Sequence, residues 1–176
     1  MTYYNFKKDL AKEKDSVAQA RLNDFYNTIL PEFEVISIDY NTDYGQFLQT
    51  AGVDKVLVKR NKYNGIDKQV FFQEKIRFDC YNDILFEYEK RSGNAGWAVC
   101  PREKSDFLLY YQNGLITMMK TAEVRDWLTA NLDEYKKKYF KQTDNKNVII
   151  PKSVVKANIK TWEWKLSDYQ NKQKRG

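Results

Sequence analysis

Four polar side chains interrupt an apolar segment near the middle of the sequence, and their types suit chemistry. They are Gln73, Glu74, Lys75 and Arg77, which follow the apolar run VFF. Placing such groups in a buried strand costs free energy unless each finds a partner, so core packing alone does not explain them. Because strand side chains alternate, Gln73, Lys75 and Arg77 should share one face and Glu74 the other.

Acidic residues lie on the segments before and after this strand. Asp54 opens the preceding segment, 19 residues before Gln73, and Asp83 and Glu87 lie on the following one. Carboxylate oxygens are preferred ligands of Mg²⁺ and Mn²⁺, which polarise a phosphoryl oxygen and lower the pKa of bound water. Lys75 beside such an ion would orient the attacking hydroxide or stabilise transition-state charge. The residue set therefore suits hydrolysis assisted by a hard metal ion.

Each of these residues also has an ordinary structural interpretation. Asp54 fits a turn residue that opens a strand. Gln73 and Lys75 fit an exposed strand face, paired across the sheet with an acid such as Glu87. Arg77 fits a salt-bridge partner. Both interpretations stay open on the sequence.

The composition limits the mechanisms that the chain can use. It has 176 residues, 42% of them hydrophobic, and no His. Catalysis by Ser-His-Asp or Cys-His arrangements and by His-metal nucleases is therefore excluded. A net charge of +6 favours polyanionic partners such as nucleic acid. Cys80 and Cys100 lack a CxxC partner, which predicts free, buried thiols rather than a zinc site.

The hydrophobic pattern predicts a single domain over residues 1–176, of α/β or α+β class, with a central mixed sheet flanked by helices. The predicted elements are helices over 3–30 and 121–140 and strands over 53–60, 69–78 and 83–90. The strands should continue as a meander through GWAVC, followed by a hairpin at Asn113-Gly114 and a final edge strand in NVIIPKSVV. No segment has the roughly 20 apolar residues of a spanning helix, so we expect no membrane partner and a cytoplasmic location.

The sequence resembles the PD-(D/E)XK nuclease superfamily. In that family, an Asp that opens one strand and an acid-X-Lys tripeptide on the neighbouring strand bind a divalent metal. The matching residues are Asp54 in GVDKVL and the tripeptide QEK at 73–75 in VFFQEKIR. The resemblance covers about residues 3–140, leaves 141–176 as a C-terminal extension, and extends to QERFR-type variants from phage and bacteria. It implies a restriction-endonuclease-like fold.

The resemblance also implies a set of site residues. The catalytic residues would be Asp54, Gln73, Lys75 and Glu87. The ligands of Mg²⁺ or Mn²⁺ would be Asp54, Glu74 and Glu87. The contacts to nucleic acid would be Lys75, Arg77, Lys59 and Arg60. Because Gln73 stands where the family has an acid, Glu87, Asp83 or a Glu74 turned inward by a bulge would have to supply the carboxylate.

The expected function is hydrolysis of phosphodiester bonds by a metal-dependent endonuclease, with DNA as the favoured partner. Two alternatives remain. One is a nuclease-fold module that binds nucleic acid without cutting it, because Gln73 has weakened metal binding. The other is a small accessory or interaction factor that uses its Tyr and Trp side chains at a protein interface. The sequence leaves a homodimer open.

Overall fold

The computed structural model of the protein describes residues 16–36, 38–77, 82–112 and 114–166. The helices are α2 (Ser16–Ile29), α3 (Asp43–Thr50), α4 (Thr121–Tyr139) and α5 (Lys152–Asn158). The strands are β1 (Glu34–Ile36), β2 (Lys55–Arg60), β3 (Ile66–Arg77), β4 (Asp83–Glu89), β5 (Phe107–Gln112), β6 (Leu115–Lys120), β7 (Phe140–Gln142), β8 (Lys146–Pro151) and β9 (Thr161–Lys165). These elements form an α+β fold, which confirms the predicted class.

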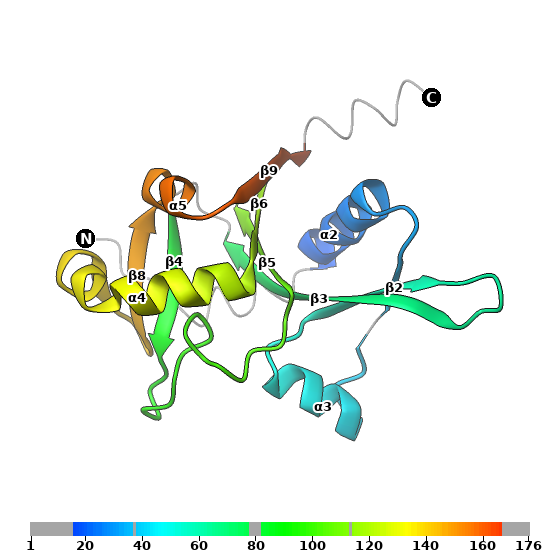
Figure 1. Ribbon diagram of the computed structural model, residues 1–176, viewed down its shortest axis with the longest axis horizontal. Helices are drawn as coiled ribbons and strands as arrows, with labels where there is room; N and C mark the ends of the chain where they lie inside the picture. The colour runs from blue at the N-terminus through cyan, green and yellow to red at the C-terminus, as the bar shows by residue number, and fades with distance from the viewer. Residues whose placement is uncertain (1–15, 37, 78–81, 113, 167–176) are drawn as a thin grey trace.

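The larger sheet is mixed and has six strands in the order β1-β2-β3-β5-β6-β9. β3 pairs antiparallel with β2 and parallel with β5. Two carboxylates flank β3 at the points where its neighbours begin: the Glu74 N–H donates to Asp54 Oδ2 at 2.8 Å, and the Phe71 N–H donates to Asp106 Oδ2 at 2.8 Å. The far ends of β2 and β3 project from the body as an arm (Figure 1).

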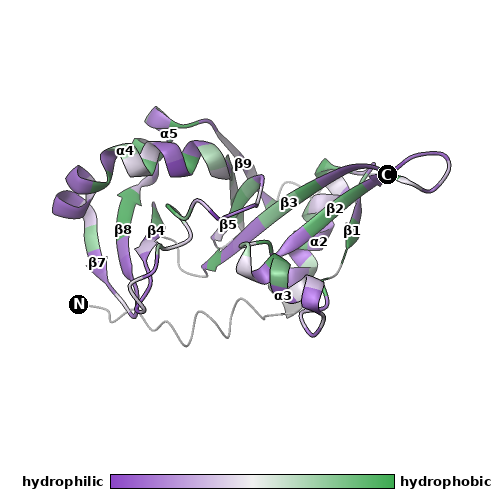
Figure 2. Cartoon of the chain, turned by 60° about the horizontal axis from the view of Figure 1, so that its bottom comes forward, coloured by the Kyte–Doolittle hydropathy of each residue, from purple (hydrophilic) through white to green (hydrophobic). Residues whose placement is uncertain are grey.

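Apolar side chains cover both faces of this sheet. α2 lies on one face, where Leu22, Phe25 and Tyr26 pack against Phe72 and Leu109. α3 lies on the opposite side of β2 and β3 (Figures 1 and 2). Along β3 and β5, alternate residues therefore enter two different cores, as strand geometry requires.

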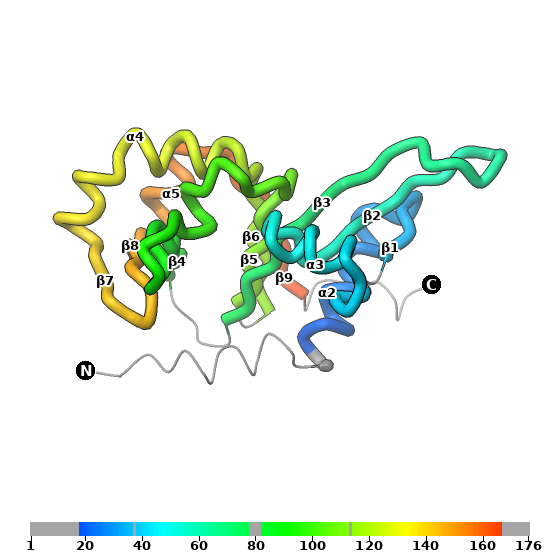
Figure 3. Tube along the Cα trace, turned by 90° about the horizontal axis from the view of Figure 1, so that it is seen from below, coloured from blue at the N-terminus to red at the C-terminus, as the bar shows by residue number. Residues whose placement is uncertain are grey.

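The smaller sheet has three strands in the order β4-β8-β7 and forms a separate layer on one side of β5 and β6 (Figure 3). One face of it packs with α4 and with the second face of the large sheet, through Phe86, Val148, Leu128, Leu108 and Tyr110. Tyr110 of β5 is thus a packing residue. This arrangement leaves a space between the two sheets, bounded by β3, β4, β5 and β8.

Three sequence predictions are wrong here. The strand over 83–90 does not join 53–60 and 69–78 in one meander, because β4 pairs with β8 in the other sheet. The alternation of apolar residues in this strand indicates that one face is buried, but it does not indicate which strand lies beside it. The segment GWAVC forms turns rather than a strand, with the Gly96 N–H donating to the Tyr88 carbonyl. The segment NVIIPKSVV is no edge strand, because β8 is central and residues 152–158 are helical.

Other predictions are confirmed. The helix at 121–140 is α4, and the hairpin of β5 and β6 turns through Gly114 at φ +84°. The helix expected over 3–30 is present as α2, while residues 3–15 lie outside the described ranges.

The segment expected as a C-terminal extension completes both sheets, since β8 lies in the small one and β9 borders the large one. In the described part of the chain, no helix is long and apolar enough to cross a membrane.

Candidate active site

A pocket of about 270 Å³ lies between the two sheets, and its lining includes four of the residues singled out by sequence: Gln73, Lys75, Arg77 and Glu87. Its polar lining includes Gln73, Lys75, Arg77, Glu87, Lys90, Glu103 and Asn147. The first three come from one face of β3, as the alternation predicts. The pocket thus combines cationic, acidic and amide side chains from β3, β4, β8 and the segment between β4 and β5.

Gln73 is the most informative residue of the pocket. Its side chain is 4% exposed, and its Oε1 atom is buried without a hydrogen-bond partner in the described structure. An unsatisfied buried acceptor costs about 1–3 kcal/mol, so native proteins rarely keep one without a reason. The amide oxygen is therefore suited to receive a donor or a cation from a ligand of the pocket.

Asp54 precedes β2 and combines a structural contact with a charge beside the site. Its Oδ2 atom accepts the Glu74 N–H, in the place where a backbone carbonyl would continue the ladder. Burial raises the pKa of its carboxyl group, against the opposing effect of the Lys75 ammonium group. The interpretation of Asp54 as the residue that opens a strand is thus correct, and it leaves the carboxylate within electrostatic range of Lys75.

Glu103 is a site residue that the sequence analysis missed. It lines the pocket, is 8% exposed, and accepts a long 3.5 Å hydrogen bond from the Ser105 hydroxyl. Burial raises its pKa to about 7, with Asp54 adding to the shift and Lys75 opposing it. Gly52 makes room for it: a Cβ atom at this residue would lie 1.5 Å from Glu103 Oε1. The only sequence signal was an acid in the polar segment PREKS, which resembles an exposed loop.

Glu74 points away from the pocket. Its Oε1 accepts the Tyr26 hydroxyl at 3.0 Å and its Oε2 accepts the Gln19 amide at 3.3 Å, both from α2. Burial raises the pKa of Glu74 to about 7. Within the described ranges, no group of three or more Asp, Glu, His or Cys side chains is placed to hold a metal ion. The expected ligands Asp54, Glu74 and Glu87 therefore do not converge.

Three further residues reach the pocket with partners of their own. Glu87 Oε2 accepts the side-chain amide of Asn145. Arg77 is buried and forms a 2.9 Å ion pair with Asp83, which agrees with the salt-bridge interpretation. Lys75 Nζ lies 5.4 Å from the centroid of the half-buried Trp97 ring, in cation–π range.

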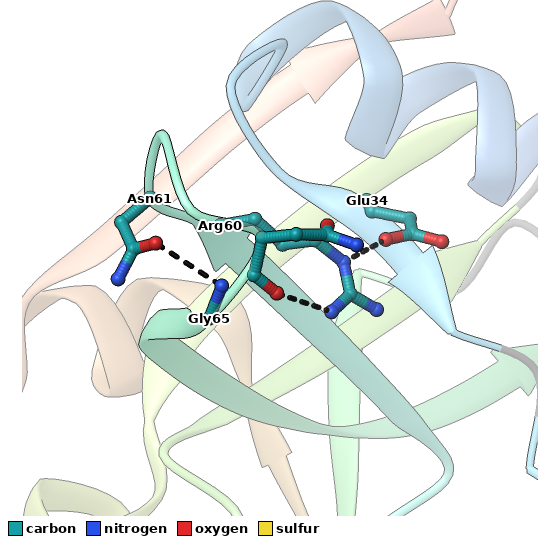
Figure 4. Close-up of polar contacts among 5 residues, drawn as sticks. Glu34, Arg60, Asn61 and Gly65 are labelled. Carbon is teal, nitrogen blue, oxygen red and sulfur yellow. Dashed lines mark hydrogen bonds and ion pairs between the residues drawn. The ribbon is translucent and has the colours of Figure 1, made fainter.

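Lys59 and Arg60 lie on the arm and not in the pocket. Lys59 forms an ion pair with Glu32 at 2.8 Å and Arg60 with Glu34 at 2.9 Å. Arg60 also donates to the Asn64 carbonyl, so it ties the turn of the arm to β1 (Figure 4). Both cations are partly neutralised, and they do not join Lys75 and Arg77 on one surface.

Comparisons with protein-family models, with curated proteins and with solved structures found no match. The functional inference therefore rests on the geometry and chemistry of the pocket.

Proposed function

We propose that this protein is a metal-dependent nuclease that hydrolyses phosphodiester bonds, with DNA as its substrate, in the pocket between the two sheets. The observation that carries the proposal is the buried, unpaired Gln73 amide oxygen in a pocket that also holds Lys75 and the buried carboxyl group of Glu103. The resemblance to PD-(D/E)XK nucleases supports it, because Asp54 and Lys75 stand on neighbouring strands as in that family.

We infer that the cofactor would be a hard divalent cation. Asp54, Gln73 and Glu103 would hold it, because two carboxylates and a neutral amide oxygen are the ligand types of Mg²⁺ and Mn²⁺. Burial raises the pKa of both carboxyl groups more than the Lys75 ammonium group lowers it, so a bound cation would favour their ionised form. A bound ion would supply Lewis-acid polarisation of the phosphoryl oxygen and a water of lowered pKa. Glu103 thus takes the role expected for Glu87 or Glu74.

The basic residues of the pocket would bind and orient the substrate. Lys75 donates to a phosphate oxygen and stabilises the charge that develops on it, while Trp97 limits the positions of its ammonium group. The ion pair with Asp83 holds the Arg77 guanidinium in one position at the pocket. From there Arg77 would donate hydrogen bonds to the phosphate and orient it.

Cleavage assays with metal test this proposal. Purified protein is incubated with duplex, single-stranded and branched DNA and with RNA, each with Mg²⁺ or Mn²⁺. Lys75→Ala should lower turnover at least tenfold while DNA affinity changes little, because the lysine acts mainly in the transition state. Lys59→Ala, a lysine of the arm, is the matched control and should cleave like the wild type. If the wild type cleaves none of these substrates faster than Asp54→Asn does, the proposed nuclease activity is refuted.

A second function, a module that binds nucleic acid without cutting it, is favoured by the amide at position 73. A neutral ligand binds a divalent cation more weakly than a carboxylate. Calorimetric titration with Mn²⁺ decides: under this hypothesis the wild type shows no binding and Gln73→Glu restores it. DNA affinity should still fall steeply with salt, as phosphate contacts require.

A further inference from the structure

Exposed apolar side chains concentrate on one part of the molecule, outside the candidate active site. Six large hydrophobic residues are exposed in the described ranges, and five of them fall between residues 40 and 66: Tyr40, Tyr44, Phe47, Tyr63 and Ile66. The sixth, Phe140, lies elsewhere in the sequence, at β7. Tyr44 and Ile66 line one pocket, and exposed apolar side chains around such a pocket are typical of interaction sites.

A second pocket, of about 230 Å³, lies within this area between α3 and the strands of the arm. Its apolar lining is mainly aliphatic: Ile36, Ile38, Leu48, Val56, Val58 and Ile66, with Tyr44. An apolar cavity of about 150 Å³ is enough to hold benzene, so an aromatic side chain fits here. We call this pocket, with the five exposed residues around it, the α3 patch.

The same patch also carries a projecting side chain. Tyr63 at the tip of the arm is 81% exposed. The turn that holds it is ordered by Asn61, whose Oδ1 accepts the N–H groups of Tyr63 at 2.9 Å and Gly65 at 3.1 Å (Figure 4 shows the second). An ordered backbone turn loses little conformational entropy when a partner buries the side chain that it carries. The patch therefore presents both a projection and a cavity able to receive one.

Charges on the patch are distributed in the same complementary way. Asp39 lines the apolar pocket and Asp43 opens α3 beside it. The tip of the arm carries Lys62 next to Tyr63, with its Nζ 4.9 Å from the centroid of the tyrosine ring. If a tip like this one entered a pocket like this one, a lysine would approach two carboxylates. Arg60 also lines the pocket but is paired with Glu34, so Asp39 and Asp43 leave this area with a net negative charge, which disfavours nucleic acid as the occupant.

We propose that the α3 patch is the interface of a two-fold homodimer, in which Tyr63 of each copy enters the apolar pocket of the other and Lys62 meets Asp39 and Asp43. Two-fold symmetry makes this exchange reciprocal, so that both pockets are filled and both lysines are paired. The inference is independent of the proposed nuclease activity.

Sedimentation of the full chain over a range of concentrations tests the dimer. Tyr63→Ala should raise the dissociation constant of the dimer at least tenfold, because a buried aromatic anchor dominates such interfaces. The matched control is Phe140→Ala, an exposed aromatic outside the patch, which should leave the dissociation constant unchanged. A protein that stays monomeric, or a dimer that Tyr63→Ala does not weaken, overturns the proposal.

Charge reversal identifies the partner as a second copy. Asp43→Lys and Lys62→Glu should each weaken the dimer, because each places like charges together at both ends of the interface. An equimolar mixture of the two variants should dimerise again, since each reversed residue then meets its opposite. If the mixture stays monomeric, the proposed arrangement is wrong. Variants that lower DNA affinity while the protein is monomeric would assign the patch to nucleic acid instead.

Discussion

The buried carboxyl group of Glu74 should make the protein less stable as the pH rises through neutrality. Burial raises the pKa of Glu74 to about 7, from an ordinary value of 4.5, against the smaller effects of its hydrogen bonds from Gln19 and Tyr26. The folded state therefore holds a proton that the unfolded state releases between these two values. Linkage then requires the free energy of unfolding to fall across this window and to level off above it.

The size of the effect follows from the shift. One pKa unit corresponds to about 1.4 kcal/mol, so Glu74 alone removes at most about 3 kcal/mol of stability between pH 4.5 and pH 7. Glu74→Gln keeps the shape of the side chain and an acceptor for the Tyr26 hydroxyl, but it carries no titratable proton. The variant should lose this part of the pH dependence and be more stable than the wild type at pH 8.

Urea denaturation at pH 5, 6, 7 and 8 measures the prediction. The advantage of Glu74→Gln should grow with pH by up to about 3 kcal/mol. Glu103 titrates in the same window in both proteins, so a residual slope remains. Tyr26→Phe should instead make the free energy of unfolding depend more steeply on pH, because it removes a hydrogen bond that lowers the pKa of Glu74. Parallel stability curves for the wild type and Glu74→Gln would show that Glu74 is charged throughout and that the reasoning is wrong.

Two more predictions concern the walls of the candidate active site. Gly52→Ala should displace the Glu103 carboxylate and lower both Mn²⁺ affinity and cleavage, because the new Cβ would overlap it. Gly93→Ala is the control for backbone strain alone, since Gly93 also has positive φ but a Cβ atom there would meet nothing within 4 Å. Cys100 is half-buried and lines the pocket, so its alkylation in a Cys80→Ser background should block DNA cleavage. Bound DNA should slow this alkylation, whose rate is measured by mass spectrometry. Equal labelling rates with and without DNA would contradict this.

Local patterns in the sequence predicted the helix α4, the strands β2, β3 and β4, and the face of β3 that carries the site. The alternation through Gln73, Lys75 and Arg77 fixed their common side, because strand geometry depends only on neighbouring residues. The assignment of Glu74 as a ligand required a bulge. The pairing of β3 with β5 runs without a register shift from Phe72 to Arg77, so Glu74 stays on the α2 side.

Long-range pairings explain what the sequence could not show. β4 finds its partner β8 about sixty residues later in the chain, and the alternation of DILFEYE is the same whichever strand it joins. Glu103 enters the pocket from a segment without regular structure, whose path is set by contacts with Gly52 and Ser105. Such an acid cannot be distinguished from a solvated one by its sequence neighbours.

β3 has a mechanical consequence, since a single strand carries both Ile66 of the α3 patch and Gln73 of the pocket. Seven residues of extended chain span about 23 Å. β2 pairs with β3 along this stretch and β5 joins it from Phe72 onward, which limits shortening or slipping of the strand. The carboxylates of Asp54 and Asp106 hold it from either edge close to the pocket. β3 therefore acts as a spacer of fixed length: a partner bound to the arm stays at a constant distance from a molecule bound in the pocket.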